Sequence, residues 1–212
     1  YDEIHYDKVV QEWVDSDATA GGTVLEVVNA SVETTYGIRS NNSTGLDLNY
    51  RASDKDGTGK VALGGAKKGS FVDVTGVKSI SVATSATNDV EIFGNNQLLT
   101  VTIAGDGAND FDFHGLSKTG TITIDASTAT GSNALHLGSE WRKGTVVKGA
   151  EAGYTELGIV LPADTFAAQP WTNIDALALM EGSNGQLDLA GSGITKIIME
   201  DTSLSHNSVL YN

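Results

Sequence analysis

The 212-residue chain carries 27 acidic and 13 basic side chains, which gives a formal net charge of −14, and it contains no cysteine. A charge of this sign repels nucleic acids and anionic membrane surfaces, and the absence of cysteine excludes disulfides, thiolate nucleophiles and zinc–thiolate sites. No segment approaches the ~20 consecutive apolar residues that a membrane-spanning helix needs. We therefore expect neither a nucleic-acid partner nor a membrane span.

The beginning of the chain differs from the rest. Residues 1–20 combine helically spaced apolar side chains with acidic ones, and we expect them to form a helical lead-in or a linker. The apolar side chains in question are Ile4, Val9, Val10, Trp13 and Val14. Residues 21–70 indicate an irregular β segment, with strands expected at residues 23–28 and 45–50.

A short phrase recurs from residue 71 to residue 212. In most copies two apolar residues flank a polar one, and a Gly, Asn, Asp or Ser stretch precedes the next copy, in most cases 10 to 13 residues further on. Alternation with a period of two is typical of a strand with one buried face. Residues 71–212 are therefore predicted to form a repetitive β body. The apolar pairs are Ile80/Val82, Val90/Ile92, Val101/Ile103, Phe111/Phe113, Ile122/Ile124, Leu135/Leu137, Val146/Val147, Leu157/Ile159, Leu177/Leu179, Leu187/Leu189, Ile197/Met199 and Val209/Leu210.

Two all-β architectures fit this spacing. Two steps make a coil of about 20 residues, as in a β-solenoid of parallel strands, and the same spacing fits a β-sandwich of antiparallel hairpins. Hairpins favour two-residue turns, whereas gaps such as 104–110 and 126–133 are longer, so we predict the solenoid. Residues 162–171 hold both prolines and are expected to leave the stack and carry a helical turn. The residues predicted to share one core are Ile103, Phe113, Ile124, Leu137, Leu179 and Leu189.

Two acidic loops are candidate calcium sites. Residues 105–113 (GDGANDFDF) resemble the calcium-binding nonapeptide of RTX-type secreted proteins, and the resemblance implies the ligands Asp106, Asn109, Asp110 and Asp112. In residues 54–60 (DKDGTGK), Asp54 and Asp56 have the appearance of a short calcium loop. Each loop has a plainer alternative, namely an Asx-rich turn that bonds its own backbone for the first and a hairpin turn for the second.

Other residue types give few signs of chemistry. The histidines show no zinc-site spacing and are expected at the surface. Trp141 and Trp171 lie off the strand pattern and could either stack on a sugar or partner chain, or cap the core. No nucleophile elbow, phosphate loop or dinucleotide fingerprint is present, and only three arginines occur, so the chain is predicted not to be an enzyme. The four histidines are His5, His114, His136 and His206.

The repetitive body resembles bacterial S-layer proteins and related type-I-secreted surface proteins. The resemblance is carried by residues 100–106 (TVTIAGD), 120–125 (GTITID), 131–138 (GSNALHLG) and 185–193 (GQLDLAGSG). It implies an extracellular protein at the cell surface that packs into an array or coat, with calcium at the contacts. The partners would be identical copies or neighbouring domains of a longer chain. Two alternatives stay open: an adhesin or carbohydrate-binding module that takes a surface glycan, and a β-helical polysaccharide-active enzyme.

Overall fold

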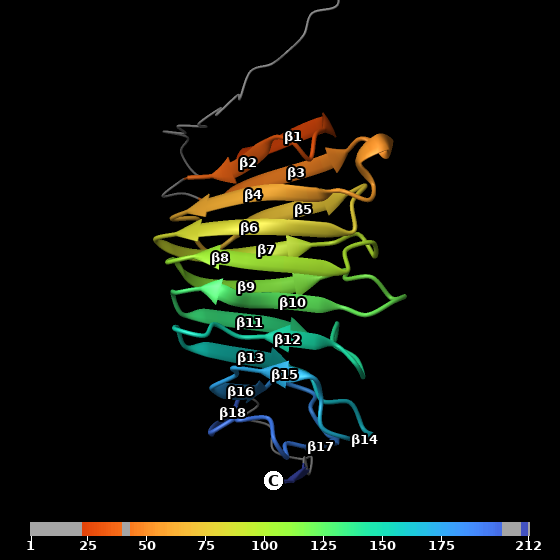
Figure 1. Ribbon diagram of the computed structural model, residues 1–212, viewed down its shortest axis with the longest axis vertical. Coiled ribbons are helices and arrows are strands. Elements are labelled where there is room, and N and C mark those ends of the chain that lie inside the picture. The colour runs from red at the N-terminus through yellow and green to blue at the C-terminus, as the bar shows by residue number, and fades with distance from the viewer. Residues whose placement is uncertain (1–22, 40–42, 201–208, 212) are drawn as a thin grey trace, which may run out of the picture.

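A computed structural model describes residues 23–39, 43–200 and 209–211. The expected helical lead-in at residues 1–20 lies outside them. The described residues are almost wholly β-structure and include a single 3-10 turn, η1 (Ala52–Asp54). The strands stack into a β-solenoid of about eight turns, which confirms the predicted fold class (Figure 1).

The strands form two long sheets and one short one. Sheet A has the spatial order β1 (Thr23–Ala30), β3 (Thr44–Tyr50), β5 (Ser70–Thr75), β7 (Thr87–Phe93), β9 (Ala108–His114), β11 (Asn133–Gly138), β13 (Thr155–Ile159), β16 (Ala176–Leu179) and β18 (Lys196–Met199). Sheet B has the order β15 (Trp171–Thr172), β12 (Val146–Lys148), β10 (Thr123–Ala129), β8 (Thr100–Gly105), β6 (Ser79–Ser85), β4 (Thr58–Gly64) and β2 (Thr35–Ile38). Sheet C contains β14 (Thr165–Phe166), β17 (Gln186–Asp188) and β19 (Val209–Tyr211).

The strand pairing distinguishes the solenoid from the sandwich. Over most of the described chain, successive strands alternate between sheets A and B, and each strand pairs with one a full coil away. Leu46 pairs with Val72 and Val72 pairs with Ile92, so these two coils take 26 and 20 residues. All described pairings are parallel, which excludes the antiparallel hairpins of a sandwich.

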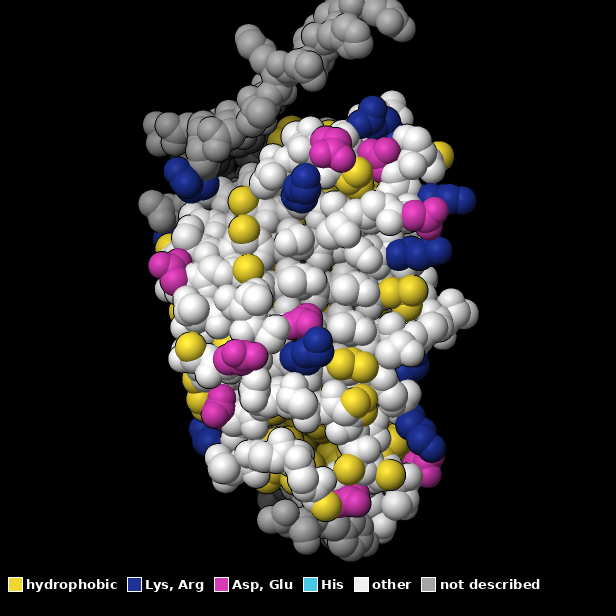
Figure 2. All heavy atoms as spheres, viewed as in Figure 1, with side chains coloured by type: hydrophobic (Ala, Val, Ile, Leu, Met, Phe, Trp, Pro, Cys, Tyr) yellow, Lys and Arg dark blue, Asp and Glu magenta, His cyan; other side chains and the backbone are white. Residues whose placement is uncertain are grey.

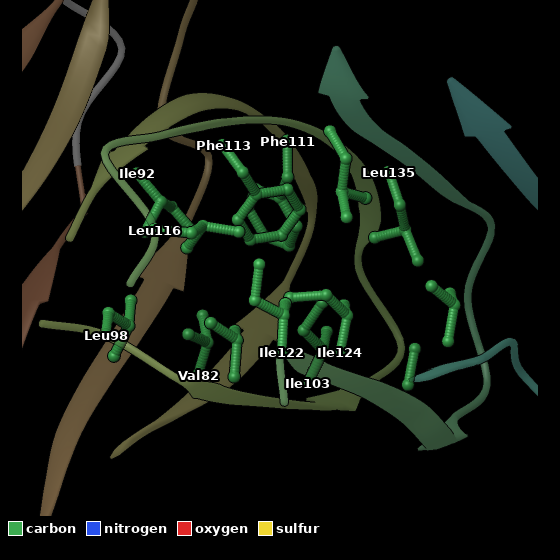
Figure 3. Close-up of a cluster of buried hydrophobic side chains, with 14 of the residues drawn as sticks. Val82, Ile92, Leu98, Ile103, Phe111, Phe113, Leu116, Ile122, Ile124 and Leu135 are labelled. Atoms are coloured by element: carbon green, nitrogen blue, oxygen red, sulfur yellow. The ribbon is translucent and has the colours of Figure 1, made fainter. Parts of the chain in front are cut away.

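A hydrophobic core fills the space between sheets A and B. Alternation turns every second side chain inward, and all six residues predicted to share the core are at most 8% exposed and belong to one cluster. Figure 3 shows the rings of Phe111 and Phe113, from sheet A, directed toward Ile122 and Ile124 on the opposite side of the coil. The sequence rhythm therefore predicted the core correctly.

Two segments differ from what the sequence indicated. Parallel pairing already includes β1 to β4, so the strands within residues 23–39 and 43–70 belong to the same stack as the later coils. The extra length of one early coil, which includes the turn η1, obscures this regularity in the sequence. The prediction of a helical turn at residues 162–171 is wrong: this segment has no helical residue and holds β14 and the first residue of β15, joined by bends and irregular backbone. Proline fixes φ and lacks a backbone donor, which disfavours a helix here.

Among the described residues, no helix has the length and apolar character that crossing a membrane requires.

Candidate functional site

The outer faces of the two long sheets differ in charge. Figures 1 and 2 have sheet B toward the viewer, and uncharged side chains and backbone predominate on that face. Its register aligns short side chains across the coils, namely Thr58, Ser79, Thr100 and Thr123 in one column and Ala62, Ala83 and Ala104 in another. The outer face of sheet A instead aligns ionisable residues, which makes it the better candidate for binding a charged ligand.

Acidic side chains from neighbouring coils gather on sheet A. Asp110 is in register with Asp89, and Asp112 is in register with Glu91. The side chains of Asp110 and Asp112 are 50% and 44% exposed, so both are accessible to an ion. Burial and repulsion from Asp110 and Asp112 raise the pKa of Asp89 above its ordinary value. Asp110 and Asp112 are thus close enough to Asp89 to oppose its ionisation.

A shallow hollow of about 340 Å³ lies beside these acids. Its rim includes Asp89, Asp110, Tyr154 and Glu156, which come from β7, β9 and the β13 region. The Tyr154 hydroxyl contacts the Glu156 carboxylate at 3.3 Å. The hollow therefore presents carboxylates from three coils to solvent.

Asn109, a predicted calcium ligand, faces the interior. It is 5% exposed and lies two residues before the buried Phe111. Its Oδ1 accepts a hydrogen bond from Asn88 Nδ2 at 3.0 Å, and its Nδ2 donates to Asn133 Oδ1 at 2.9 Å. The three amides form a buried asparagine ladder across three coils. The structure thus places Asn109 on the opposite side of β9 from Asp110 and Asp112.

Asp106, another predicted calcium ligand, lies neither in the core nor on the outer face of sheet A. It is exposed in the turn between β8 and β9, before the strand that carries Asp110 and Asp112. Of the four residues in this acidic loop, the structure brings only Asp110 and Asp112 onto one face. The reason is that a strand directs alternate side chains to opposite sides.

The second acidic loop is engaged in local contacts. Asp54 accepts hydrogen bonds from the Val32 backbone N–H at 3.1 Å and from Ser53 Oγ at 3.0 Å, and these bonds lower its pKa. Arg51 Nε lies 3.5 Å from its carboxylate. Asp56 lies 3.8 Å from Lys78 Nζ. Asp54 thus stabilises the turn η1, whereas Asp56 forms an ion pair with the next coil.

His136 was expected at the surface but is half-buried, with 18% of its side chain exposed. Its Nδ1 lies 3.4 Å from Asp112 Oδ1 and 3.9 Å from Asp110 Oδ1. The sequence did contain a signal for this contact. If the apolar pairs Phe111/Phe113 and Leu135/Leu137 are aligned, Asp112 and His136 fall opposite one another, as the observed register has them.

His114 lies at the surface, as expected, and Trp141 and Trp171 cap the core, which is the second of the two roles that the sequence allowed for them. His114 is exposed, stacks on Phe93 at a centroid distance of 4.9 Å and lies 3.7 Å from Glu91. Trp141 and Trp171 are 5% and 4% exposed, and their ring centroids lie 6.0 Å apart. Their indole N–H groups donate to backbone carbonyls. Both tryptophans therefore pack on the core instead of presenting a sugar-stacking surface.

Comparisons of the chain with protein-family models, with curated proteins and with solved structures found no match. The structure assigns the chain to the class of β-solenoids.

Proposed function

We propose that this chain is a structural segment of a cell-surface coat or array, in which further coils continue the solenoid. These coils would come from identical copies or from neighbouring parts of a longer chain. The observation that carries this proposal is the open core at β18. Ile197 and Met199 are in register with Leu177 and Leu179, which are at most 1% exposed, yet they are 38% and 48% exposed themselves.

The opposite end of sheet A, at β1, also leaves core positions partly exposed. Leu25 and Val27 are in register with the buried Leu46 and Leu48, but they are only partly buried. Among the described residues, no strand pairs with the outer edge of β1 or of β18. An unpaired edge presents backbone donors and acceptors to another strand, and a solenoid repeat buries its core only against a neighbouring coil. Both ends are therefore suited to stacking.

Calcium would assist such contacts between copies. A net charge of −14 opposes association, and a divalent cation bound near Asp110 and Asp112 would relieve part of the repulsion. Calcium accepts irregular cages of six to eight oxygens, which suits carboxylates supplied by more than one coil or copy.

Sedimentation velocity over a range of protein concentrations, with chelator or with 10 mM calcium, tests this proposal. We expect association to increase with concentration and with calcium. Met199→Lys should weaken it because a charge would enter the core position at the open end. Ala83→Lys is the matched control: Ala83 is exposed on the outer face of sheet B, in β6 within the stack and away from both ends and from the acidic face. A monomer under all conditions would overturn the array of copies, and equal effects of the two variants would exclude the open end as the contact.

The adhesin alternative receives less support from the geometry. It required exposed aromatic side chains, and Trp141 and Trp171 are buried. We therefore give priority to the structural role.

A further inference from the structure

We propose that His136, Glu156 and Glu200 form a binding site for a divalent transition-metal ion, zinc foremost, on the outer face of sheet A. One ring nitrogen of His136 and one carboxylate oxygen of each glutamate lie within 4.8 Å of one another. The residues come from β11, from β13 and from the position directly after β18. The inference goes beyond the proposed function, because it assigns a metal ion to the outer face of sheet A, whereas the stacking proposal concerns the exposed core positions at the ends of that sheet.

The strongest indication is a buried nitrogen without a partner. Among the described residues, His136 Nε2 and the Tyr50 hydroxyl are the buried side-chain polar atoms that lack a hydrogen bond. Leaving such an atom unpaired costs free energy. The other nitrogen, Nδ1, faces Asp112 at 3.4 Å. A carboxylate on one ring nitrogen with the other nitrogen free is the arrangement that histidine ligands of metals use, because the carboxylate orients the ring and selects its tautomer.

Small residues lie beside His136 on the next two coils, and the thioether of Met180 borders them: a Cβ at Gly158 would lie 3.3 Å from Met180 Sδ. In the column that continues from His136, the next two coils contribute Gly158 and Ala178. A Cβ at Gly158 would lie 2.9 Å from His136 Cδ2, so the ring rests directly on the glycine. Ala178 lies outside the core cluster, yet it is fully buried, so neighbouring side chains cover it. These small residues allow side chains from β11 and from beyond β18 to approach one another.

The ligand types identify the class of metal. An imidazole nitrogen with two carboxylates suits zinc and its neighbours, whereas calcium and magnesium take oxygen ligands. Zinc–ligand distances of about 2.0–2.1 Å place tetrahedral ligands about 3.3 Å apart. Glu156 and Glu200 would therefore need to move inward by about 1 Å when the metal binds. Asp110 and Asp112 add negative charge that attracts the cation.

Zinc titration of the full, untagged chain by isothermal calorimetry tests the proposal. Calcium at 5 mM should be present throughout, so that the sites proposed for array contacts are already supplied. We expect one zinc ion per chain, and loss of this binding in His136→Gln, Glu156→Gln and Glu200→Gln. His114→Gln is the matched control, because it removes the other described histidine and leaves the three ligands in place.

Two further variants test the supporting geometry without removing a ligand. Asp112→Asn should weaken zinc binding about 10- to 100-fold, the usual effect of losing a carboxylate partner of a histidine ligand. Gly158→Ala should displace the His136 ring and weaken binding as well. Zinc at about 100 times Kd should raise the melting temperature of the parent by about 5 °C or more, and circular dichroism of each variant without zinc verifies its fold.

Several results would overturn the site. They are the absence of zinc binding at 100 μM, unchanged binding in His136→Gln, or an equal loss in His114→Gln. Nitrogen-15 NMR of the histidines gives an independent readout, since zinc should produce an imidazole protonated only at Nδ1. An imidazolium that carries both protons, unchanged by zinc, would show that the neighbouring acids hold a proton and not a metal. A failure of this kind leaves the sedimentation test of the stacking proposal unaffected.

Discussion

Replacing Asn109 by alanine should severely destabilise the fold. The Asn109 side chain accepts a hydrogen bond from Asn88, and the two protons of its Nδ2 are shared among three acceptors, namely Asn133 Oδ1, the Gly107 carbonyl and Thr84 Oγ1, over 2.9 to 3.2 Å. Each buried hydrogen bond contributes about 0.5–1.5 kcal/mol net, and a partner left unpaired costs about 1–3 kcal/mol. Because some of these partners keep other bonds, we expect a loss of about 3–5 kcal/mol, which for a chain of this size lowers the melting temperature by roughly 6–20 °C.

Urea and thermal unfolding followed by circular dichroism measure this effect. Asp110→Asn is the matched control, because Asp110 is the next residue in β9 but its side chain is 50% exposed on the outer face. The control should lose no more than about 0.5 kcal/mol of stability, because removing the Asp110 charge also relieves its repulsion on Asp89. If Asn109→Ala also stays within about 1 kcal/mol, the asparagine ladder does not stabilise the coils and the reasoning is refuted.

Three other changes test the core and the acidic face. Ile124→Asp should cost about 3–5 kcal/mol, because it places an unpaired charge at a fully buried position; a melting temperature within two degrees of the parent would contradict the stacking. Asp89→Asn should raise the melting temperature at pH 8, since burial and repulsion from Asp110 and Asp112 raise the pKa of Asp89. A carboxylate with a raised folded-state pKa destabilises the fold at high pH and ceases to do so as the pH falls through that pKa. The gain in melting temperature should therefore vanish below about pH 4. A gain that does not depend on pH would exclude the ionisation of Asp89 as its cause. Tyr50→Phe should change the stability by no more than about 1 kcal/mol, because the buried Tyr50 hydroxyl has no hydrogen bond of good geometry among the described residues and interacts only with the Lys60 backbone; a larger loss would show that this interaction is a full hydrogen bond.

Part of the candidate site was already implied by alternation within one strand. Phe111 and Phe113 face inward, so the same parity places Asn109 inside and Asp110 and Asp112 outside. The nonapeptide resemblance implies Asn109 as a calcium ligand, whereas the parity of β9 excludes it from the outer face. His136 could likewise have been aligned with Asp112 from the neighbouring apolar pairs.

The sequence by itself determined the solenoid rhythm, the inward residues and the outward acids, because these depend on alternation within strands and on spacing between them. The sequence did not determine that the stack brings His136 and Glu200 together, because the two residues are 64 positions apart. Coil length varies from 20 to 26 residues, so errors in register accumulate along the chain. Only backbone pairing across successive coils, together with the space above Gly158 and Ala178, decides which side chains meet. Contacts of this kind depend on the tertiary stack because no local pattern specifies them.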